Sequence, residues 1–314
     1  MITEQQLVDN LNKYYGIKVT SLQIINRLMF RQSFLITTSD GIQYIVKDYS
    51  NACSLDILNQ MLNYLYKLKE FGVRVSFPIR KLHSNEFHFS NNNRYYVVFV
   101  YVEGSTCTTR QYKKIASSLK IYHKTASSNL FPSLISTEKK LQAAKDLFLC
   151  FNNDNYSIKQ EILSCKTNLF KIVDKYISCS ETIIHGDSIL ENMILSNNNI
   201  YLIDFDSMRR GDALEDVANT ILSFMYFGSK NFEIQPERAQ LIEAFINCYF
   251  DNTPPDHIKE KLHYYIQVHC VIELIRHAEN IRFLVRMPSM KDYLLLLVHI
   301  IRSENFKELM YKDE

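Results

Sequence analysis

The chain has 314 residues, of which 46% are hydrophobic, and its 36 basic and 34 acidic side chains leave a formal net charge of +2. A chain of this length is expected to form about two domains or one large unit with two lobes. Its near-neutral charge argues against a dedicated nucleic-acid binder, and no apolar run reaches the roughly 20 residues that span a bilayer. The scattered cysteines, without a CxxC pair, and the lack of a signal-peptide pattern at the N-terminus predict a cytoplasmic protein with reduced thiols.

The first hundred residues predict a small sheet that carries helices. Residues 3–15 have the spacing of a short amphipathic helix. Residues 21–50 alternate apolar and polar side chains around an Asp-Gly turn, which predicts a β-hairpin or meander. A second helical pattern covers residues 55–68, and the chain then returns to strands around an Asn-rich turn. We therefore expect residues 1–102 to form a small, β-rich N-terminal lobe.

Helical patterns dominate from residue 103 to the end of the chain, interrupted by a pair of strands within residues 183–206. Residues 103–314 are therefore expected to form a helical C-terminal lobe. Its later helices are predicted near residues 213–228, 236–250, 255–287 and 290–313.

The helix predicted over residues 255–287 interleaves acidic and basic side chains, which is typical of a solvated face but also fits the wall of a pocket. An Arg276 or Arg282 turned toward the substrate would favour an acceptor that carries a carboxylate or a phosphate.

One stretch, IIHGDSILENMILSNNNIYLIDFDS at residues 183–207, concentrates polar side chains after two apolar runs. A strand end suits chemistry, because the sheet fixes the backbone while the loop beyond it stays open to ligand. The polar residues are His185, Asp187 and Asn192 after the first run, and Asp204 and Asp206 after the second.

These residue types suit a site for phosphoryl transfer. Carboxylate and amide oxygens from Asp187, Asn192 and Asp204 can converge on Mg²⁺, which prefers oxygen ligands and is often shared with phosphates. A remaining carboxylate could accept the proton of an alcohol. Lys47, flanked by apolar residues in QYIVKDY, would supply a cation from the small lobe. Taken singly, a strand-end aspartate is more often a cap or turn residue, and a strand lysine is more often solvated.

The combination of HGD-x4-N ending at Asn192 with IDFD at residues 203–206 resembles the aminoglycoside phosphotransferase and choline kinase-like superfamily, whose members are relatives of protein kinases. The segments YIVK, YVVFVYVEG and LEDVANTI extend the resemblance over most of the chain. It implies a bilobal protein-kinase-like fold of the α+β class. The small antiparallel-sheet N-lobe, residues 1–102, would bind the nucleotide, and the larger, mainly helical C-lobe, residues 103–314, would carry the catalytic loop and the substrate site. It also implies ATP-dependent transfer of the γ-phosphoryl group to a hydroxyl of a small molecule.

By the same resemblance, Asp187 is the catalytic base, Asn192 and Asp204 bind Mg²⁺, and Lys47 holds the α- and β-phosphates. Asp206 either binds the metal directly or is an acidic residue that lies behind the direct metal ligands. His185 and Asp216 are expected to brace the loop.

The nucleotide-binding lobe departs from the family pattern at two places. The segment that would cover the phosphates, RLMFRQSF, has no glycine, so Ser33 or the backbone around it would contact them. The helix partner of Lys47 should be Glu, but Gln60 falls near that place and Asp56 is the nearest acid. Gln60 can hydrogen-bond Lys47 but cannot form an ion pair with it, so either Asp56 serves, the ion pair is dispensable, or Lys47 is less well held. Backbone groups near Phe99 and Tyr101 are expected to meet the base.

The resemblance implies ATP, or GTP in its place, together with Mg²⁺, a small-molecule hydroxyl substrate, no nucleic-acid or membrane partner, and a monomer or homodimer. The alternatives are a peptide or protein kinase on the same scaffold and a nucleotide-binding pseudokinase of the spore-coat type. Only FDSMRRGDALE separates Asp204 from Asp216, which is short for a peptide-docking platform and favours a small substrate. An intact set of Asp187, Asn192 and Asp204 argues against a pseudokinase, whereas Gln60 leaves it open.

Overall fold

A computed structural model of the chain describes residues 2–28, 31–49, 54–126, 134–149, 161, 163–176, 182–226, 236–278 and 288–310. Its internal contacts form two compact units, Met1–Ser105 with Ile194–Asp206, and Thr106–Met193 with Ser207–Glu314. The domain boundary expected after residue 102 stays a prediction.

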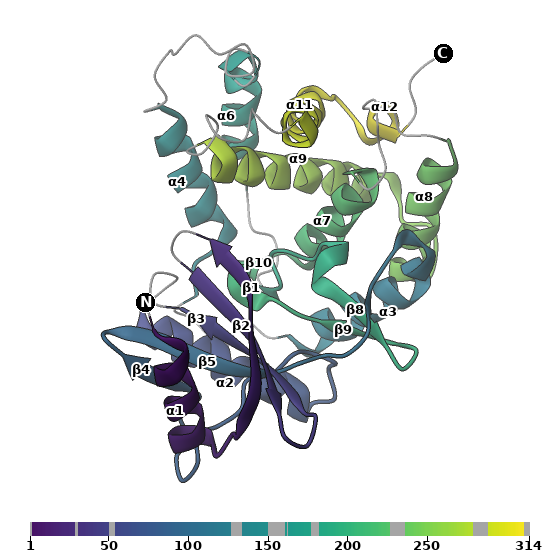
Figure 1. Cartoon of the computed structure of the whole chain (residues 1–314). Helices are drawn as coiled ribbons and strands as arrows, with labels where there is room; N and C mark the ends of the chain where they lie inside the picture. The colour runs from purple at the N-terminus through teal and green to yellow at the C-terminus, as the bar shows by residue number, and fades with distance from the viewer. Residues whose placement is uncertain are drawn as a thin grey trace. The chain divides into compact units, whose positions relative to one another are not determined.

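An antiparallel sheet of five strands is the framework of the first unit (Figure 1). The order of its strands is β1-β2-β3-β5-β4. Their bounds are β1 Val19–Leu28, β2 Arg31–Thr38, β3 Gln43–Asp48, β4 His88–Asn91 and β5 Arg94–Val100. The predicted Asp-Gly and Asn turns are confirmed, because Gly41, Asn92 and Asn93 adopt the positive φ angles that glycine and asparagine tolerate in tight turns.

Helix α1 (Glu4–Tyr15) buries one face against this sheet. Thr3 caps its first turn, and Gly16 ends it with a φ of 68°. Leu7 and Leu11 lie four residues apart on one face of the helix, and both belong to the hydrophobic core that the sheet supplies. Helix α2 (Leu55–Glu70) is capped by Ser54 and buries a leucine-rich face.

The first unit also contains a hairpin from much later in the sequence. It consists of β8 (Met193–Ser196) and β9 (Asn199–Leu202), with β6 (Ser105–Thr106) beside β8. The backbone of Leu202 exchanges hydrogen bonds with Arg74 O and Ser76 N, both 3.0 Å long. These bonds attach the end of β9, and the acidic residues after it, to the first unit.

The second unit is mainly helical and is organised around α9, which packs against α4, α6, α7, α11 and α12. In Figure 1, α9 crosses this unit with α11 and α7 on different sides. Its helices are α3 Tyr112–Thr125, α4 Thr137–Leu149, α6 Lys166–Lys175, α7 Ala213–Tyr226, α8 Pro236–Phe250, α9 Asp256–Ala278, α11 Pro288–Arg302 and α12 Phe306–Met310. None of the described helices is long and apolar enough to cross a membrane.

The two strands expected within residues 183–206 are present, but they do not pair with each other. β7 (Thr182–Ile184) pairs with β10 (Arg209–Gly211), whereas β9 pairs with β8. The reason is local, because Asn197 and Asn198 have φ angles of 46° and 66° and close β8 and β9 into a tight hairpin. β7 instead pairs with β10, which follows Asp204 and Asp206 in the sequence.

Two of the predicted helices need comment. The single helix expected over residues 290–313 is wrong, because α11 ends where Ser303 N and Oγ both donate to Ile300 O. Such local bonds from a serine compete with the helical pattern. The helix expected over residues 255–287 is described to Ala278, and residues 279–287 lie outside the described part of the chain.

Candidate active site

A cluster of opposite charges lies in the first unit at the end of β9. The Nζ atom of Lys47 on β3 lies 2.6 Å from Asp204 Oδ1 and 3.4 Å from Asp206 Oδ1. Tyr49 Oη donates a hydrogen bond of 2.6 Å to the same oxygen of Asp206. The structure therefore brings together three residues that the sequence singled out, although about half of the chain separates the lysine from the aspartates.

Electrostatics keep the Lys47 ammonium charged. Burial by itself lowers the pKa of the Lys47 ammonium, but the carboxylates of Asp206 and Asp204 outweigh burial and raise that pKa. Asp204 has a φ of 62°, a left-handed backbone that is uncommon for a residue with a side chain and recurs at functional sites. Its side chain is 42% exposed, so it can reach a ligand.

The donor set of this cluster fits a magnesium ion. Asp204 and Asp206 each place a carboxylate oxygen within reach of one cation, the ammonium of Lys47. Oxygen ligands of this kind are those that Mg²⁺ takes in proteins. The arrangement can therefore hold positive charge from a metal as well as from the lysine.

Ser33 lies directly opposite Lys47 in the register between β2 and β3. Residues paired across two antiparallel strands project to the same face of the sheet. The structure thus places Ser33 beside the lysine, as contact with the same phosphates would require.

The segment expected to meet the base is partly engaged within the first unit. Phe99 is buried and pairs with Ile45 of β3. The N–H of Tyr101 donates to Gln43 O at 3.3 Å, and the N–H of Val100 donates to Phe77 O at 3.1 Å. These two N–H groups are therefore already used in the structure, so the base-binding roles of Phe99 and Tyr101 stay predictions.

The helix partner of Lys47 stays a prediction. In the described structure the ammonium pairs with Asp204 and Asp206 instead of with Gln60 or Asp56 of α2. The two carboxylates after β9 thus supply the negative charge beside the half-buried lysine. Any direct role of Gln60 in nucleotide binding stays a prediction.

The second candidate cluster lies in the second unit, in the loop that follows β7. Asn192, which is 8% exposed, donates through Nδ2 to Asp187 O at 2.9 Å and to Asp187 Oδ2 at 3.1 Å. These two bonds fix the orientation of the Asp187 carboxylate. They leave the amide oxygen of Asn192 as the atom that could bind a metal ion.

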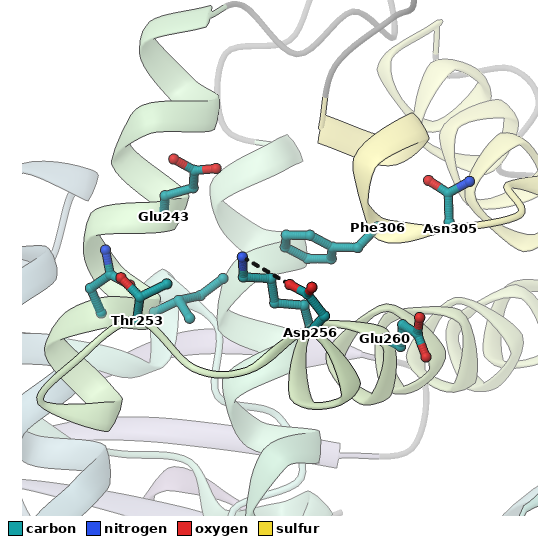
Figure 2. Close-up of a pocket in the computed structure, with 9 residues that line it drawn as sticks. Glu243, Thr253, Asp256, Glu260, Asn305 and Phe306 are labelled. Atoms are coloured by element: carbon teal, nitrogen blue, oxygen red, sulfur yellow. Dashed lines mark ion pairs between the residues drawn. The ribbon is translucent and has the colours of Figure 1, made fainter.

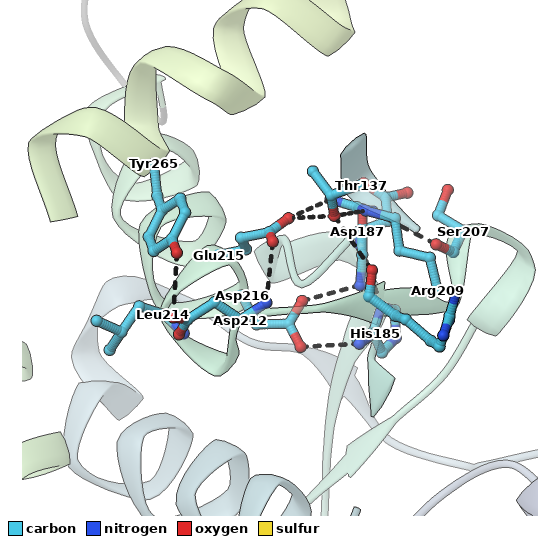
Figure 3. Close-up of polar contacts among 12 residues, drawn as sticks. Thr137, His185, Asp187, Ser207, Arg209, Asp212, Leu214, Glu215, Asp216 and Tyr265 are labelled. Carbon is cyan, nitrogen blue, oxygen red and sulfur yellow. Dashed lines mark hydrogen bonds and ion pairs between the residues drawn. The ribbon is translucent and has the colours of Figure 1, made fainter. Parts of the chain in front are cut away.

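Asp216, in the first turn of α7, holds the start of this loop (Figure 3). Its carboxylate accepts hydrogen bonds of 2.8 Å from the N–H groups of His185 and Gly186, and its Oδ2 lies 3.0 Å from His123 Nε2. Burial by itself raises the pKa of Asp216, but the hydrogen bond and charge of His123, the charge of His185 and the Gly186 N–H outweigh burial. They hold the pKa well below its usual range. The predicted bracing contact between Asp216 and the loop is thus present.

The rest of the loop is held by the same face of α7. Thr220 Oγ1 donates to Ser188 O at 2.7 Å, and Ser223 Oγ accepts from Leu190 N at 3.1 Å. Residues 216, 220 and 223 follow the spacing that puts side chains on one face of a helix. The buried polar face of α7 therefore acts as a template for the backbone around Asp187.

Sequence reasoning missed several residues of this arrangement. Tyr49 had a usable signal, because it lies two residues after Lys47 and successive odd positions of a strand share a face. His123 lies on α3, remote in sequence from its partner Asp216. Arg209 and Glu215 form a buried ion pair of 3.2 Å, and no pattern in the sequence indicated it.

A separate pocket of about 620 Å³ lies in the second unit (Figure 2). It is lined by residues of α8, α9 and the start of α12, including the carboxylates of Glu243, Asp256 and Glu260. Lys259 Nζ lies 3.5 Å from Asp256 Oδ1. None of the site residues predicted from the sequence lines this pocket.

Comparison with solved structures supports the fold. The chain is similar to the amicoumacin kinase hAmiN, in complex with AMP-PNP, Ca²⁺ and Ami, with a TM-score of 0.76 and 13% identity over 96% of this chain and 93% of that one. It is also similar to the spectinomycin phosphotransferase APH(9)-Ia, in complex with ADP and spectinomycin, with a TM-score of 0.65 and 17% identity over 96% and 98% of the chains. The choline kinase LicA from Streptococcus pneumoniae gives 0.67 and 19% over 96% and 99%.

These similarities confirm the predicted protein-kinase-like fold of the α+β class. A comparison with curated protein sequences found no match. Residues 24–254 match the family described as the phosphotransferase enzyme family, APH. Because that match covers most of the sequence and agrees with the fold, the chain belongs to the phosphotransferase enzyme family.

Proposed function

We propose that this chain is an ATP- and Mg²⁺-dependent kinase that transfers the γ-phosphoryl group to a hydroxyl of a small molecule. The observation that carries the proposal is the convergence of Lys47 with Asp204 and Asp206, at 2.6 and 3.4 Å. A lysine ammonium beside two carboxylates supplies both a phosphate ligand and metal ligands, the two parts that phosphoryl transfer requires.

Binding of the nucleotide is assigned to the first unit. Lys47 exchanges a carboxylate oxygen of Asp204 for phosphate oxygens, and Ser33 beside it donates its hydroxyl to the same phosphates. Asp204 and Asn192, with Asp206, would hold Mg²⁺, which when bound neutralises the charge on the phosphates. Tyr49 keeps Asp206 in place through its hydrogen bond of 2.6 Å.

Chemistry at the acceptor is assigned to Asp187. Its carboxylate takes the proton of the attacking hydroxyl while the hydroxyl oxygen forms a bond to the γ-phosphorus. The bond between that phosphorus and the bridging oxygen breaks, and ADP leaves with the electron pair. Asn192 orients the Asp187 carboxylate through the bond of 3.1 Å, so the base is aligned before the substrate binds.

The segment after Asp204 supports a small acceptor over a peptide. It consists of a single 3₁₀ turn, Phe205–Ser207, followed by the short strand β10 and then α7. Arg209 and Glu215 within it are buried. This segment therefore offers no long surface on which a peptide could dock. Spectinomycin, which is bound in one of the similar structures, is a small molecule.

The roles expected of Arg276 and Arg282 toward the acceptor stay predictions, because residues 279–287 and the side chains of Arg276 and His277 lie outside the described part of the chain.

Two measurements test the proposed function. Mg·ATP or Mg·GTP at about 100 times its dissociation constant should stabilise the fold by about 2.7 kcal/mol, seen as a higher melting temperature. A panel of small hydroxyl compounds with either nucleotide should then give one product heavier by a phosphoryl group. Lys47→Met is the matched control and should lose the stabilisation. A folded wild-type chain that neither nucleotide stabilises would overturn the proposal.

A further inference from the structure

The second unit contains a buried ion pair that lies beside the loop of Asp187. The side chains of Arg209 on β10 and Glu215 in the first turn of α7 are 1% and 0% exposed, and Arg209 Nη2 lies 3.2 Å from Glu215 Oε2. Such a pair loses the hydration of both charges, so it is tolerated only when hydrogen bonds satisfy the remaining donors and acceptors. Where these bonds go therefore indicates what the pair holds.

The carboxylate of Glu215 is used completely by its own surroundings. Oε1 accepts from Tyr176 Oη at 2.7 Å and from Asp212 N at 3.0 Å. Oε2 accepts from Thr137 Oγ1 at 2.6 Å in addition to Arg209. With four donors from different elements, Glu215 is a fixed anchor for the guanidinium.

Arg209 uses its other donors on two backbone carbonyls and on the hydroxyl of Thr137 (Figure 3). Nη1 donates to Gly186 O at 2.9 Å and reaches Ser207 O at 3.4 Å, while Nε donates to Thr137 Oγ1 at 2.8 Å. The planar fork of an arginine can make these bonds and the ion pair at once, which a lysine ammonium cannot.

The bond to Gly186 O fixes one peptide group in particular. The carbonyl of Gly186 belongs to the peptide that joins it to Asp187, whereas its N–H belongs to the peptide shared with His185. Asp216 holds the N–H side at 2.8 Å and Arg209 holds the carbonyl side at 2.9 Å. Two successive peptide planes are thereby fixed, and together they determine where the Cα atom of Asp187 lies.

The backbone at this position is shaped to admit the guanidinium. Gly186 has a φ of 77°, and a Cβ atom there would lie 2.2 Å from Arg209 Nη1 and 2.3 Å from Ser207 O. Any side chain at residue 186 would therefore displace the arginine. The glycine, the arginine and the carbonyl of Ser207 form one packed contact.

We propose that Arg209, held by Glu215, is a positioning residue for phosphoryl transfer, an assignment that rests on the proposed function. It acts through the Gly186 carbonyl to set the backbone of Asp187, and through Ser207 it joins that loop to the chain that follows Asp206. Loss of this contact should move the base rather than weaken nucleotide binding.

The test removes the pair while avoiding an uncompensated buried charge. In the double variant Arg209→Met/Glu215→Gln both charges are absent, and replacing both members of a buried pair is often close to neutral for stability. The matched control is Lys261→Met, which breaks the 2.7 Å pair between Lys261 and Asp212 in the same unit, while Tyr265 still donates to Asp212. Lys261 makes no described contact with the loop of Asp187.

The first readout is the hydrolysis of Mg·ATP, in which water takes the place of the acceptor. The rate is measured from the ADP that is released. A displacement of about 1 Å at a reacting group costs on the order of 10²-fold, so kcat of the double variant should fall by about 10- to 100-fold. Its KM for Mg·ATP should stay within about threefold of wild type, because Lys47 and Asp204 are untouched. Arg209→Lys, which keeps the charge beside Glu215 but lacks the fork, should also lose kcat and serves if the double variant fails to fold.

The second readout does not depend on activity. Amide hydrogen exchange is measured for the peptide that covers residues 185–192, in the double variant and in a Lys261→Met variant with the same melting temperature. Exchange should be about tenfold faster or more in the double variant. Unchanged exchange and a kcat within about twofold of the control, in a folded variant, would overturn the assignment. A wild-type chain that neither hydrolyses Mg·ATP nor phosphorylates any compound of the hydroxyl panel would refute the proposed function instead, and hydrogen exchange alone would then decide whether Arg209 holds the loop.

Discussion

The two polar clusters of this chain have similar chemistry but opposite exposure to solvent. In the first unit, Lys47 pairs with Asp204, whose side chain is 42% exposed. In the second unit, Arg209 and Glu215 are 1% and 0% exposed, and every oxygen of the glutamate accepts from more than one donor.

This difference in exposure separates what each cluster can do. A partly exposed ion pair is worth little to stability, so Lys47 can exchange a carboxylate for a phosphate at small cost. A buried pair is costly to break once it has formed, because a single remaining charge has no partner. The open cluster is therefore suited to ligand exchange, and the closed network is suited to holding a backbone in one conformation.

The largest effect is expected at Asp187, which the closed network supports. Asp187→Asn should lower kcat by about 10²–10⁴-fold, the usual contribution of a general base, with little change in affinity for Mg·ATP. Single-turnover kinetics with the acceptor found by the panel measures the chemical step directly. A variant with full activity would show that this carboxylate is not the base.

The next effect tests the closed network through stability. Asp216→Asn should lower the free energy of unfolding by about 3–5 kcal/mol, because it breaks a buried charged contact with His123 and two backbone N–H groups. The exposed Asp204→Asn is the matched control and should cost less than about 1 kcal/mol. Denaturant titration of both variants measures the difference, and equal losses would remove the contrast between the clusters.

The same carboxylate predicts a pH dependence. The pKa of Asp216 is lower in the folded chain than its ordinary value near 3.9. Its contribution to stability is therefore fully present above about pH 4 and is lost as the pH falls below that value. The free energies of unfolding of the wild type and of Asp216→Asn should therefore converge as the pH falls below about 4. Acid titration of both proteins measures this convergence.

A smaller effect is expected at Tyr49 in the open cluster. Tyr49→Phe removes one hydrogen bond to the Asp206 carboxylate, a loss of about 1–2 kcal/mol that should weaken Mg·ATP binding by roughly 5- to 30-fold. Tyr44→Phe on the same strand is the control and should bind like wild type. Equal affinity for Mg·ATP in both variants would show that the hydrogen bond from Tyr49 to Asp206 does not contribute to nucleotide binding.

The smallest effect is expected at Gln60. Because Lys47 contacts Asp204 and Asp206 instead of α2, Gln60→Glu should change the affinity for Mg·ATP by less than about twofold. Calorimetry on the variant measures this. A gain of about tenfold or more would indicate that the helix partner forms once the nucleotide is bound.

The sequence predicted part of the candidate site and the periodic helices, because strand ends and helix faces can be recognised from short stretches of sequence. Lys47 and the two aspartates after β9 were predicted together from their motifs, and the structure places them in contact. The periodic segments α1 and α2 were predicted for the same reason, since their apolar faces repeat at helical spacing.

What the sequence did not reveal depends on tertiary contacts between short or polar segments. β10 is three residues long and begins with two arginines, so no alternation marks it as a strand. The partnership of Arg209 with Glu215 follows only once β10 lies beside β7 and α7 begins next to it. The helix partner of Lys47 stays a prediction, because the described structure pairs the ammonium with Asp204 and Asp206.

The most direct test of the account is calorimetry of Mg·ATP with the wild type, Asp204→Asn and Asp187→Asn. The wild type should bind Mg·ATP and lose most of that affinity when a chelator removes Mg²⁺. Asp204→Asn should weaken binding by about tenfold or more because it removes a metal ligand, whereas Asp187→Asn should bind like the wild type. An Asp204→Asn variant with unchanged Mg²⁺-dependent binding, beside an Asp187→Asn variant that no longer binds, would contradict the assignment of ligand and base.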